Sequence, residues 1–131
     1  ADFDRAIQLQ PDNAAAYTGR GLAYHHKGNF DRAIGDFDRA IQLQPNFAEA
    51  YKNRGNAHAA KGDTDRAITD FDRAIQLQPD YAGAYLDRGF AYVEKGEKEK
   101  ATADFKKVLE LSDDPYLRQQ AEEQLKALGA K

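Results

Sequence analysis

The sequence contains no cysteine in its 131 residues, which excludes disulfides and thiolate metal sites. No apolar run approaches the roughly 20 residues of a membrane-spanning helix. Positive charge is not in excess either, because 19 Lys and Arg stand against 22 Asp and Glu, a net charge of −3. Phosphate contacts require clustered basic side chains. We therefore expect neither a membrane nor a nucleic acid as a partner.

Methionine is also absent, and no signal peptide is visible at the N-terminus. The first residues already belong to a block that recurs further along the chain. We interpret the chain as a piece of a longer protein. The compartment is left open by these observations, with the cytoplasm favoured.

One block of residues recurs at a fixed spacing of 34 residues, at 2–11, 36–45 and 70–79, and a diverged fourth copy begins at Asp104. Strict self-similarity at this period is typical of a solenoid, in which each unit buries its apolar face only against its neighbours. The pattern predicts a protein that presents a surface to a partner.

The unit spanning 48–81 shows how each repeat is built. Both of its halves carry apolar or small residues three or four positions apart, which is helical spacing. Gly62 can take a positive φ at the end of the first helix, and Asp63 can cap the second. Pro79 stops the second helix, and Asp80 is a plausible cap for the next unit. Each unit is therefore predicted to be two antiparallel helices.

The recurring pattern is aromatic–x–x–Arg–Gly–x–Ala–aromatic, then Lys-Gly, then Asp-Arg-Ala-Ile, then Phe, Ala and Pro; it resembles the tetratricopeptide repeat. Three full units of 34 residues, 14–47, 48–81 and 82–115, follow the second helix of a truncated repeat at 1–13 and precede a capping helix at 116–131. The resemblance implies one all-α domain, a right-handed superhelical solenoid whose first helices line a concave groove. It also implies a protein–protein interaction module that binds a peptide or helix of a partner.

The chain departs from the family where Arg20, Arg54 and Arg88 replace a residue that is usually aliphatic. Each Arg is accompanied by an acid on the second helix, which for Arg54 is Asp70. We expect a structural Arg–Asp pair in each unit, with the Arg stem covering the core. On this view Arg54→Leu is tolerated and Asp70→Leu alone destabilises. A basic ladder for an acidic ligand is the alternative.

The resemblance places ten candidate peptide-binding residues along the groove: Thr18, Leu22, His25, Lys52, Asn53, Asn56, Leu86, Asp87, Phe90 and Val93. Some family members hold the acidic C-terminal tail of heat-shock chaperones with Lys and Asn on successive first helices. Lys52 and Asn56 resemble the opening pair of that clamp. Asp87, however, stands where the next unit should offer Asn, and a carboxylate there repels a carboxylate. The chaperone-tail clamp is therefore disfavoured.

The two ends of the chain suggest an alternative function as a self-assembling scaffold. Phe3 and Ile7 belong to a second helix whose first helix is missing, which leaves an apolar stripe exposed. Leu117 and Leu125 lie on the stripe of the polar capping helix. A cap helix of one molecule could take the place of the missing helix in the next, and such a contact propagates as a filament or closes as a ring.

Two further classes of protein are less consistent with the sequence. A helical-repeat RNA binder of the pentatricopeptide kind needs a basic groove, and Glu49, Asp87 and Glu94 oppose that. An enzyme needs an acid, base or nucleophile constellation, which the sequence does not offer. The adjacent His25 and His26 point about 100° apart on a helix, so they do not chelate one metal easily. We expect no catalytic residues, no cofactor and no metal.

Overall fold

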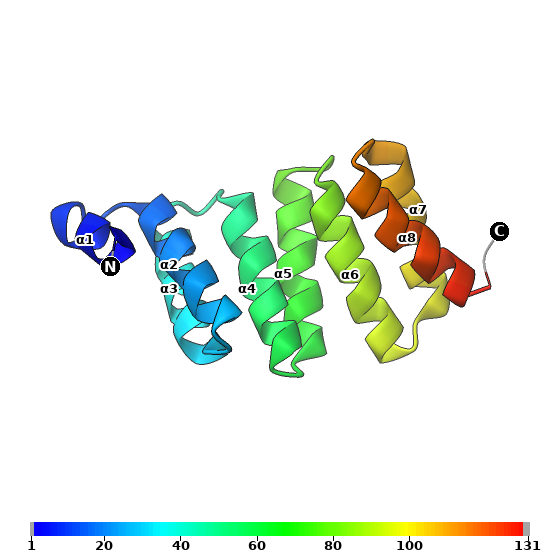
Figure 1. The fold of residues 1–131 in the computed structure, drawn as a ribbon, viewed down its shortest axis with the longest axis horizontal. Coiled ribbons are helices and arrows are strands. Elements are labelled where there is room, and N and C mark those ends of the chain that lie inside the picture. The colour runs from blue at the N-terminus through cyan, green and yellow to red at the C-terminus, as the bar shows by residue number, and fades with distance from the viewer. Residues whose placement is uncertain (1, 130–131) are drawn as a thin grey trace.

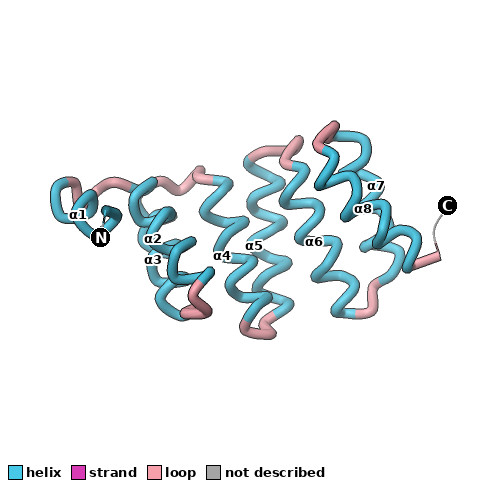
Figure 2. The backbone as a smooth tube through the Cα atoms, viewed as in Figure 1, coloured by secondary structure: helices cyan, strands magenta, loops and turns pink. Residues whose placement is uncertain are grey.

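The computed structural model describes residues 2–129, and all regular secondary structure in that part of the chain is α-helical. The helices follow one another along the long axis, with α1 and α8 at opposite ends (Figure 1). Only short turns and loops join them (Figure 2). Their bounds are α1 Asp2–Leu9, α2 Ala14–His26, α3 Phe30–Leu43, α4 Ala48–Ala60, α5 Thr64–Leu77, α6 Ala82–Lys95, α7 Lys98–Leu111 and α8 Pro115–Ala127.

The turn inside each helix pair follows the sequence prediction. Gly62 has φ +87° between α4 and α5, a conformation that favours glycine because it has no Cβ. Asp63 is the N-terminal capping residue of α5, because its side chain accepts a hydrogen bond from the backbone N–H of Arg66 at 3.4 Å. The prediction that Asp80 caps the next unit was wrong. Tyr81 is the capping residue of α6, because its backbone carbonyl accepts the first helical hydrogen bonds, and no side chain caps that end.

The packing inside each pair depends on a glycine against a phenylalanine ring. A Cβ on Gly55 would lie 2.7 Å from Cε1 of the Phe71 ring, far closer than two carbon atoms approach. Because glycine has no Cβ, the Phe71 ring can pack directly against α4, and it is buried there. The same contact joins Gly21 to Phe37 and Gly89 to Phe105. Glycine costs about 1 kcal/mol relative to alanine inside a helix, and burial of a large aromatic ring offsets that cost.

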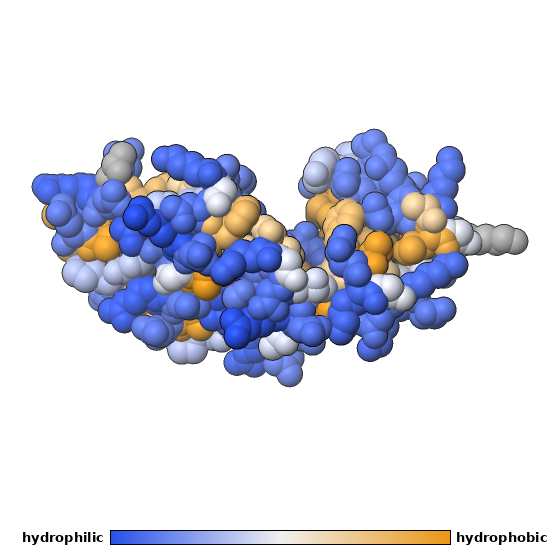
Figure 3. All heavy atoms as spheres, turned by 90° about the horizontal axis from the view of Figure 1, so that it is seen from below, coloured by the Kyte–Doolittle hydropathy of each residue, from blue (hydrophilic) through white to orange (hydrophobic). Residues whose placement is uncertain are grey.

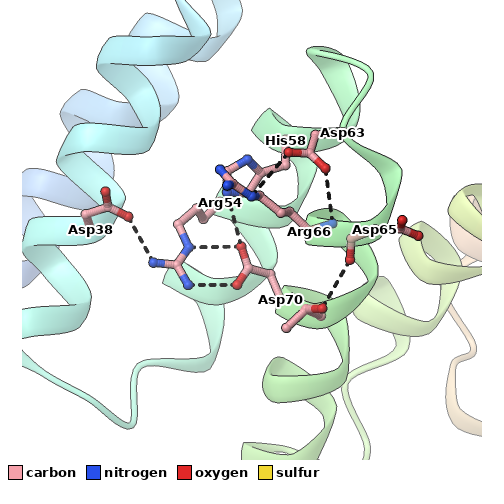
Figure 4. Close-up of polar contacts among 8 residues, drawn as sticks. Asp38, Arg54, His58, Asp63, Asp65, Arg66 and Asp70 are labelled. Atoms are coloured by element: carbon pink, nitrogen blue, oxygen red, sulfur yellow. Dashed lines mark hydrogen bonds and ion pairs between the residues drawn. The ribbon is translucent and has the colours of Figure 1, made fainter.

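A charged network accompanies this core (Figure 4). Arg54 donates from Nε and Nη2 to the two carboxylate oxygens of Asp70, at 2.9 and 2.7 Å. The same two bonds join Arg20 to Asp36 and Arg88 to Asp104, so the predicted pair within each unit is confirmed. The bond to Asp70 is the main cause that raises the pKa of Arg54 above its ordinary value.

The sequence did not reveal that each Arg also bridges two units. Arg54 Nη1 donates to Asp38 on α3 at 2.9 Å, and Arg88 Nη1 donates to Asp72 on α5 at 2.9 Å. Arg54 therefore joins three helices, and its guanidinium also lies 5.4 Å from the centre of the Tyr51 ring. All the oxygen partners are aspartates of the protein itself. The network accounts for the arginines without an acidic ligand.

The two ends of the solenoid differ in what they expose. Phe3 is 43% exposed although its ring packs against Gly19 of α2, and Leu9 is 66% exposed. Ile7 is half-buried. At the other end Leu117 and Leu125 pack against the buried core of α6 and α7. Both leucines are half-buried, as Ile7 is, and their role in self-association stays a prediction.

Candidate functional site

The first helices of the three pairs form one side of the molecule. In Figure 1, α2, α4 and α6 lie in front of α3, α5 and α7. Figure 3 views the molecule from below, and there it forms an arc whose upper edge is hollowed. Hydrophobic residues border this hollow on both sides. The concave side is therefore lined by first helices, and it is where the candidate peptide-binding residues must be sought.

Exposure divides the ten predicted groove residues into two groups. Thr18, Asn53 and Leu86 are buried, so they are not open to a ligand in this structure, contrary to their predicted role. Thr18 instead donates from its hydroxyl to the carbonyl of Ala14 at 3.0 Å. The other seven are half-buried, and they are Leu22, His25, Lys52, Asn56, Asp87, Phe90 and Val93.

Several of the half-buried residues also support the core. Phe90 meets Phe105 edge to face, with 5.5 Å between ring centres, and Val93 packs against the same cluster. His25 meets the Phe30 ring at 5.1 Å. Burial is the main cause that lowers the pKa of His25 below its ordinary value, and His26 lowers it further. These half-buried side chains therefore also contribute to packing within the protein.

Three polar residues from α4 and α6 come together on this side. Asn56 Nδ2 donates to Asp87 Oδ2 at 3.0 Å, and Lys52 Nζ lies 3.6 Å from the same oxygen. Burial raises the pKa of Asp87, whereas the charge of Lys52 and the bond from Asn56 oppose that rise. Lys52 and Asn56 are the two residues that resemble the opening pair of the clamp. In this protein they already hold a carboxylate, that of Asp87.

Tyr81 completes this group, and the sequence analysis missed it. Lys52 Nζ lies 5.9 Å from the centre of the Tyr81 ring, and the Lys52 stem lies beside Gly83, where a Cβ added to that glycine would be 3.8 Å from it. Burial raises the pKa of Tyr81 to about 12, with further contributions from Glu49 and Asp87. The only signal in the sequence is an aromatic residue at the same repeat position, Phe47.

A cavity of about 400 Å³ lies next to this group, and we call it the α4–α6 pocket. It carries two carboxylates, from Asp87 and Glu94, and two aromatic rings, from Phe71 and Phe90. Its full lining is Asn56, Ala59, Gly62, Thr64, Phe71, Asp87, Phe90, Ala91 and Glu94. A pocket of this size with apolar walls and a few polar groups has the features of a ligand-binding site.

Within residues 2–129 no three His, Cys, Asp or Glu side chains are grouped to hold a metal ion. His58 Nε2 lies 3.8 Å from Asp70 Oδ2 and so borders the Arg54 network (Figure 4). Asn53 is buried, and its Nδ2 has no hydrogen-bond partner within the described part of the chain.

No described helix combines the length and apolar character that crossing a bilayer requires.

Family models match three overlapping parts of the chain. A tetratricopeptide repeat model matches residues 3–35, a TPR repeat model matches residues 21–62, and a second tetratricopeptide repeat model matches residues 55–126. The last match covers more than half of the chain, and the chain belongs to the tetratricopeptide repeat family. The predicted all-α superhelical solenoid is thereby confirmed. No curated protein matches the sequence.

Solved structures of the same fold include domains with bound peptides. The chain is similar to the first TPR domain of Spaghetti (RPAP3) bound to the HSP90 peptide SRMEEVD, with 26% identity, 88% of this chain and 90% of that chain covered, and a TM-score of 0.83. The second TPR domain of human RPAP3, in complex with the HSP70 peptide SGPTIEEVD, shows 29% identity, coverage of 90% and 96%, and a TM-score of 0.81. A thermophilic TPR protein of Thermus thermophilus, TTC0263, shows 25% identity, coverage of 97% and 71%, and a TM-score of 0.87.

Proposed function

We propose that this chain is a protein-interaction module that binds an extended or helical segment of a partner along the concave face of α2, α4 and α6. The observation that carries the proposal is the α4–α6 pocket on that face. The half-buried ring of Phe90 and the exposed Ala59 there can contact an apolar partner side chain, and the amide of Asn56 can bond to a peptide group. Two similar TPR domains are bound to peptides.

The partner that we propose differs from an acidic chaperone tail. In this protein Lys52 and Asn56 are engaged by Asp87. A C-terminal carboxylate would have to displace that contact and then face the Asp87 charge across a few ångströms. Like charges at such a distance cost binding energy. We therefore infer that the similarity in fold does not extend to the ligand.

A groove-blocking variant tests the proposal. Ala59 is exposed on α4 and lines the α4–α6 pocket, so Ala59→Trp fills the site without disturbing the core. Ala103→Trp, at an exposed position on α7, is the matched control. Seven-residue random peptides with blocked ends are selected on the wild-type protein and then measured on both variants. Loss of binding by Ala59→Trp alone supports the groove, and equal binding by both variants contradicts it.

End-to-end assembly is a second candidate, because Phe3 and Leu9 expose apolar surface on α1. On α8 the charged side chains of Glu122, Glu123 and Lys126 are exposed, and Tyr116 is 65% exposed, so the possible complementary surface is of mixed polarity. Light scattering after size exclusion over a wide range of protein concentration tests it. A mass that rises with concentration, and that Phe3→Glu abolishes, supports assembly. A monomer throughout rejects it for this chain.

A further inference from the structure

We infer that the α4–α6 pocket binds a basic side chain, arginine or lysine, of the partner segment. The inference rests on the proposed function, because it names the chemistry of the anchor in the same groove. The first argument for it is the negative charge of the pocket lining. Asp87 and Glu94 both line the pocket, and Glu94 is exposed and has no ion pair within residues 2–129. Among the described residues, the only cation in contact with either carboxylate is Lys52, at 3.6 Å from Asp87.

Other basic side chains near the pocket point away from it. Lys61 follows the last residue of α4, and its Nζ donates to Asp31 on α3. Lys95 ends α6, and its Nζ donates to Asp65 on α5 at 2.8 Å. Both lysines are thus held against second helices of the preceding unit. Neither lysine neutralises the pocket, and the Glu94 carboxylate is left for a ligand to pair with.

The helix ends at the pocket do not decide the sign of its potential. Ala59 from the last turn of α4 and Glu94 from the last turn of α6 line it, but so does Thr64, the first residue of α5. Helix C-termini carry a partial negative charge and helix N-termini a partial positive one, so these effects oppose each other. The two carboxylates therefore supply the negative potential that favours a cation over a neutral or acidic group.

The apolar lining suits the stem of a long basic side chain. The half-buried ring of Phe90 lines the pocket together with the small side chains of Ala59 and Ala91. Lysine and arginine bury their methylene groups against such surfaces while the charged head reaches a polar site. The pocket thus combines an apolar wall for the stem with carboxylates for the head.

The test uses the peptides selected on the wild-type protein and lost with Ala59→Trp. We expect one position in them to be enriched in arginine or lysine. Replacement of that arginine by citrulline, which keeps the shape and removes the charge, should weaken binding about tenfold in fluorescence anisotropy. Asp87→Asn and Glu94→Gln should each weaken the arginine peptide severalfold and leave the citrulline peptide unchanged. Glu123→Gln, the same charge change on the exposed face of α8, should have no effect.

Each outcome decides between the two proposals. If the selected groove-binding peptides carry no enriched basic residue, or if citrulline leaves their affinity unchanged, the proposal that the pocket binds a basic side chain is wrong. The proposed function as a peptide-binding module would stand. Failure to obtain any peptide that Ala59→Trp blocks would overturn both. Circular dichroism melting of each variant checks its fold. Glu94→Gln lies on the exposed rim, so the test does not depend on Asp87→Asn being well folded.

Discussion

Arg54 binds the buried carboxylate of Asp70 through two parallel hydrogen bonds of 2.9 and 2.7 Å. The pair is asymmetric, because the Asp70 side chain is 6% exposed whereas that of Arg54 is 23% exposed and also bonds to Asp38. The carboxylate therefore depends on this arginine more than the arginine depends on it. This asymmetry fixes which single substitution should be the more harmful.

The geometry reverses the order of stability effects expected from the sequence. Arg54→Leu leaves a buried carboxylate without its cation and should lower the free energy of unfolding by about 3 kcal/mol. Asp70→Leu leaves an arginine that keeps Asp38 and reaches water, and should cost about 1 to 2 kcal/mol. Urea unfolding of the two variants measures the order, and a larger loss for Asp70→Leu would contradict it. The double variant should lose less than the sum of the two.

Two substitutions of glycine by alanine should have opposite effects. Gly55→Ala places a methyl group 2.7 Å from the Phe71 ring and should destabilise the protein by about 1 to 3 kcal/mol, despite the better helix propensity of alanine. Gly35→Ala, on α3 with no atom within 4 Å of the new methyl group, should stabilise it by about 1 kcal/mol. Thermal melting measures both, and a gain for Gly55→Ala would contradict the packing described.

The stability of the protein should respond to pH through Asp87. Burial raises its pKa in the folded state above the ordinary value, which is about 3.9 for an aspartate in an unfolded chain. Its contribution to stability is therefore fully present below about pH 4 and is lost as the pH rises through the folded-state pKa. Asp87→Asn removes this dependence. The variant should gain stability relative to the wild type as the pH rises from about 3 to about 7, and a relative loss over that interval in urea titrations would contradict the sign.

Asp87→Asn should also change which peptides bind. The substitution removes the carboxylate that Lys52 and Asn56 hold, and it supplies the Asn that the clamp pattern requires. The variant should bind the peptide SRMEEVD at least about tenfold more tightly than the wild type does. The same peptide with an amidated C-terminus is the control and should show no gain. Equal affinity of both proteins for SRMEEVD in calorimetry would contradict the prediction.

The sequence predicted those features that repeat within one unit. Gly62, Asp63 and the Arg54–Asp70 pair follow from local rules and a period of 34 residues, and the structure has them all. Contacts between units were not predicted. Whether Asp38 reaches Arg54 depends on the angle between successive helix pairs, which the repeat pattern does not specify.

The same reason explains the errors in the candidate site. Asn53 and Leu86 were expected on an open groove, but they are buried. Tyr81 was missed because it ends one unit and contacts Lys52, which lies near the start of that unit in sequence and on α4 in space. A helical wheel assigns each residue a direction on its own helix. It does not say which directions a neighbouring helix will cover.

The arginine bridges between units differ in exposure from the Arg–Asp pairs within a unit. The inner aspartates are buried, whereas Asp38, which receives the bond between units, has a side chain that is 48% exposed. Dissolved ions screen exposed charges far more than buried ones. We therefore expect added salt to weaken the ion pairs between repeats more than the pairs within a repeat, and so to loosen how successive helix pairs are held relative to one another.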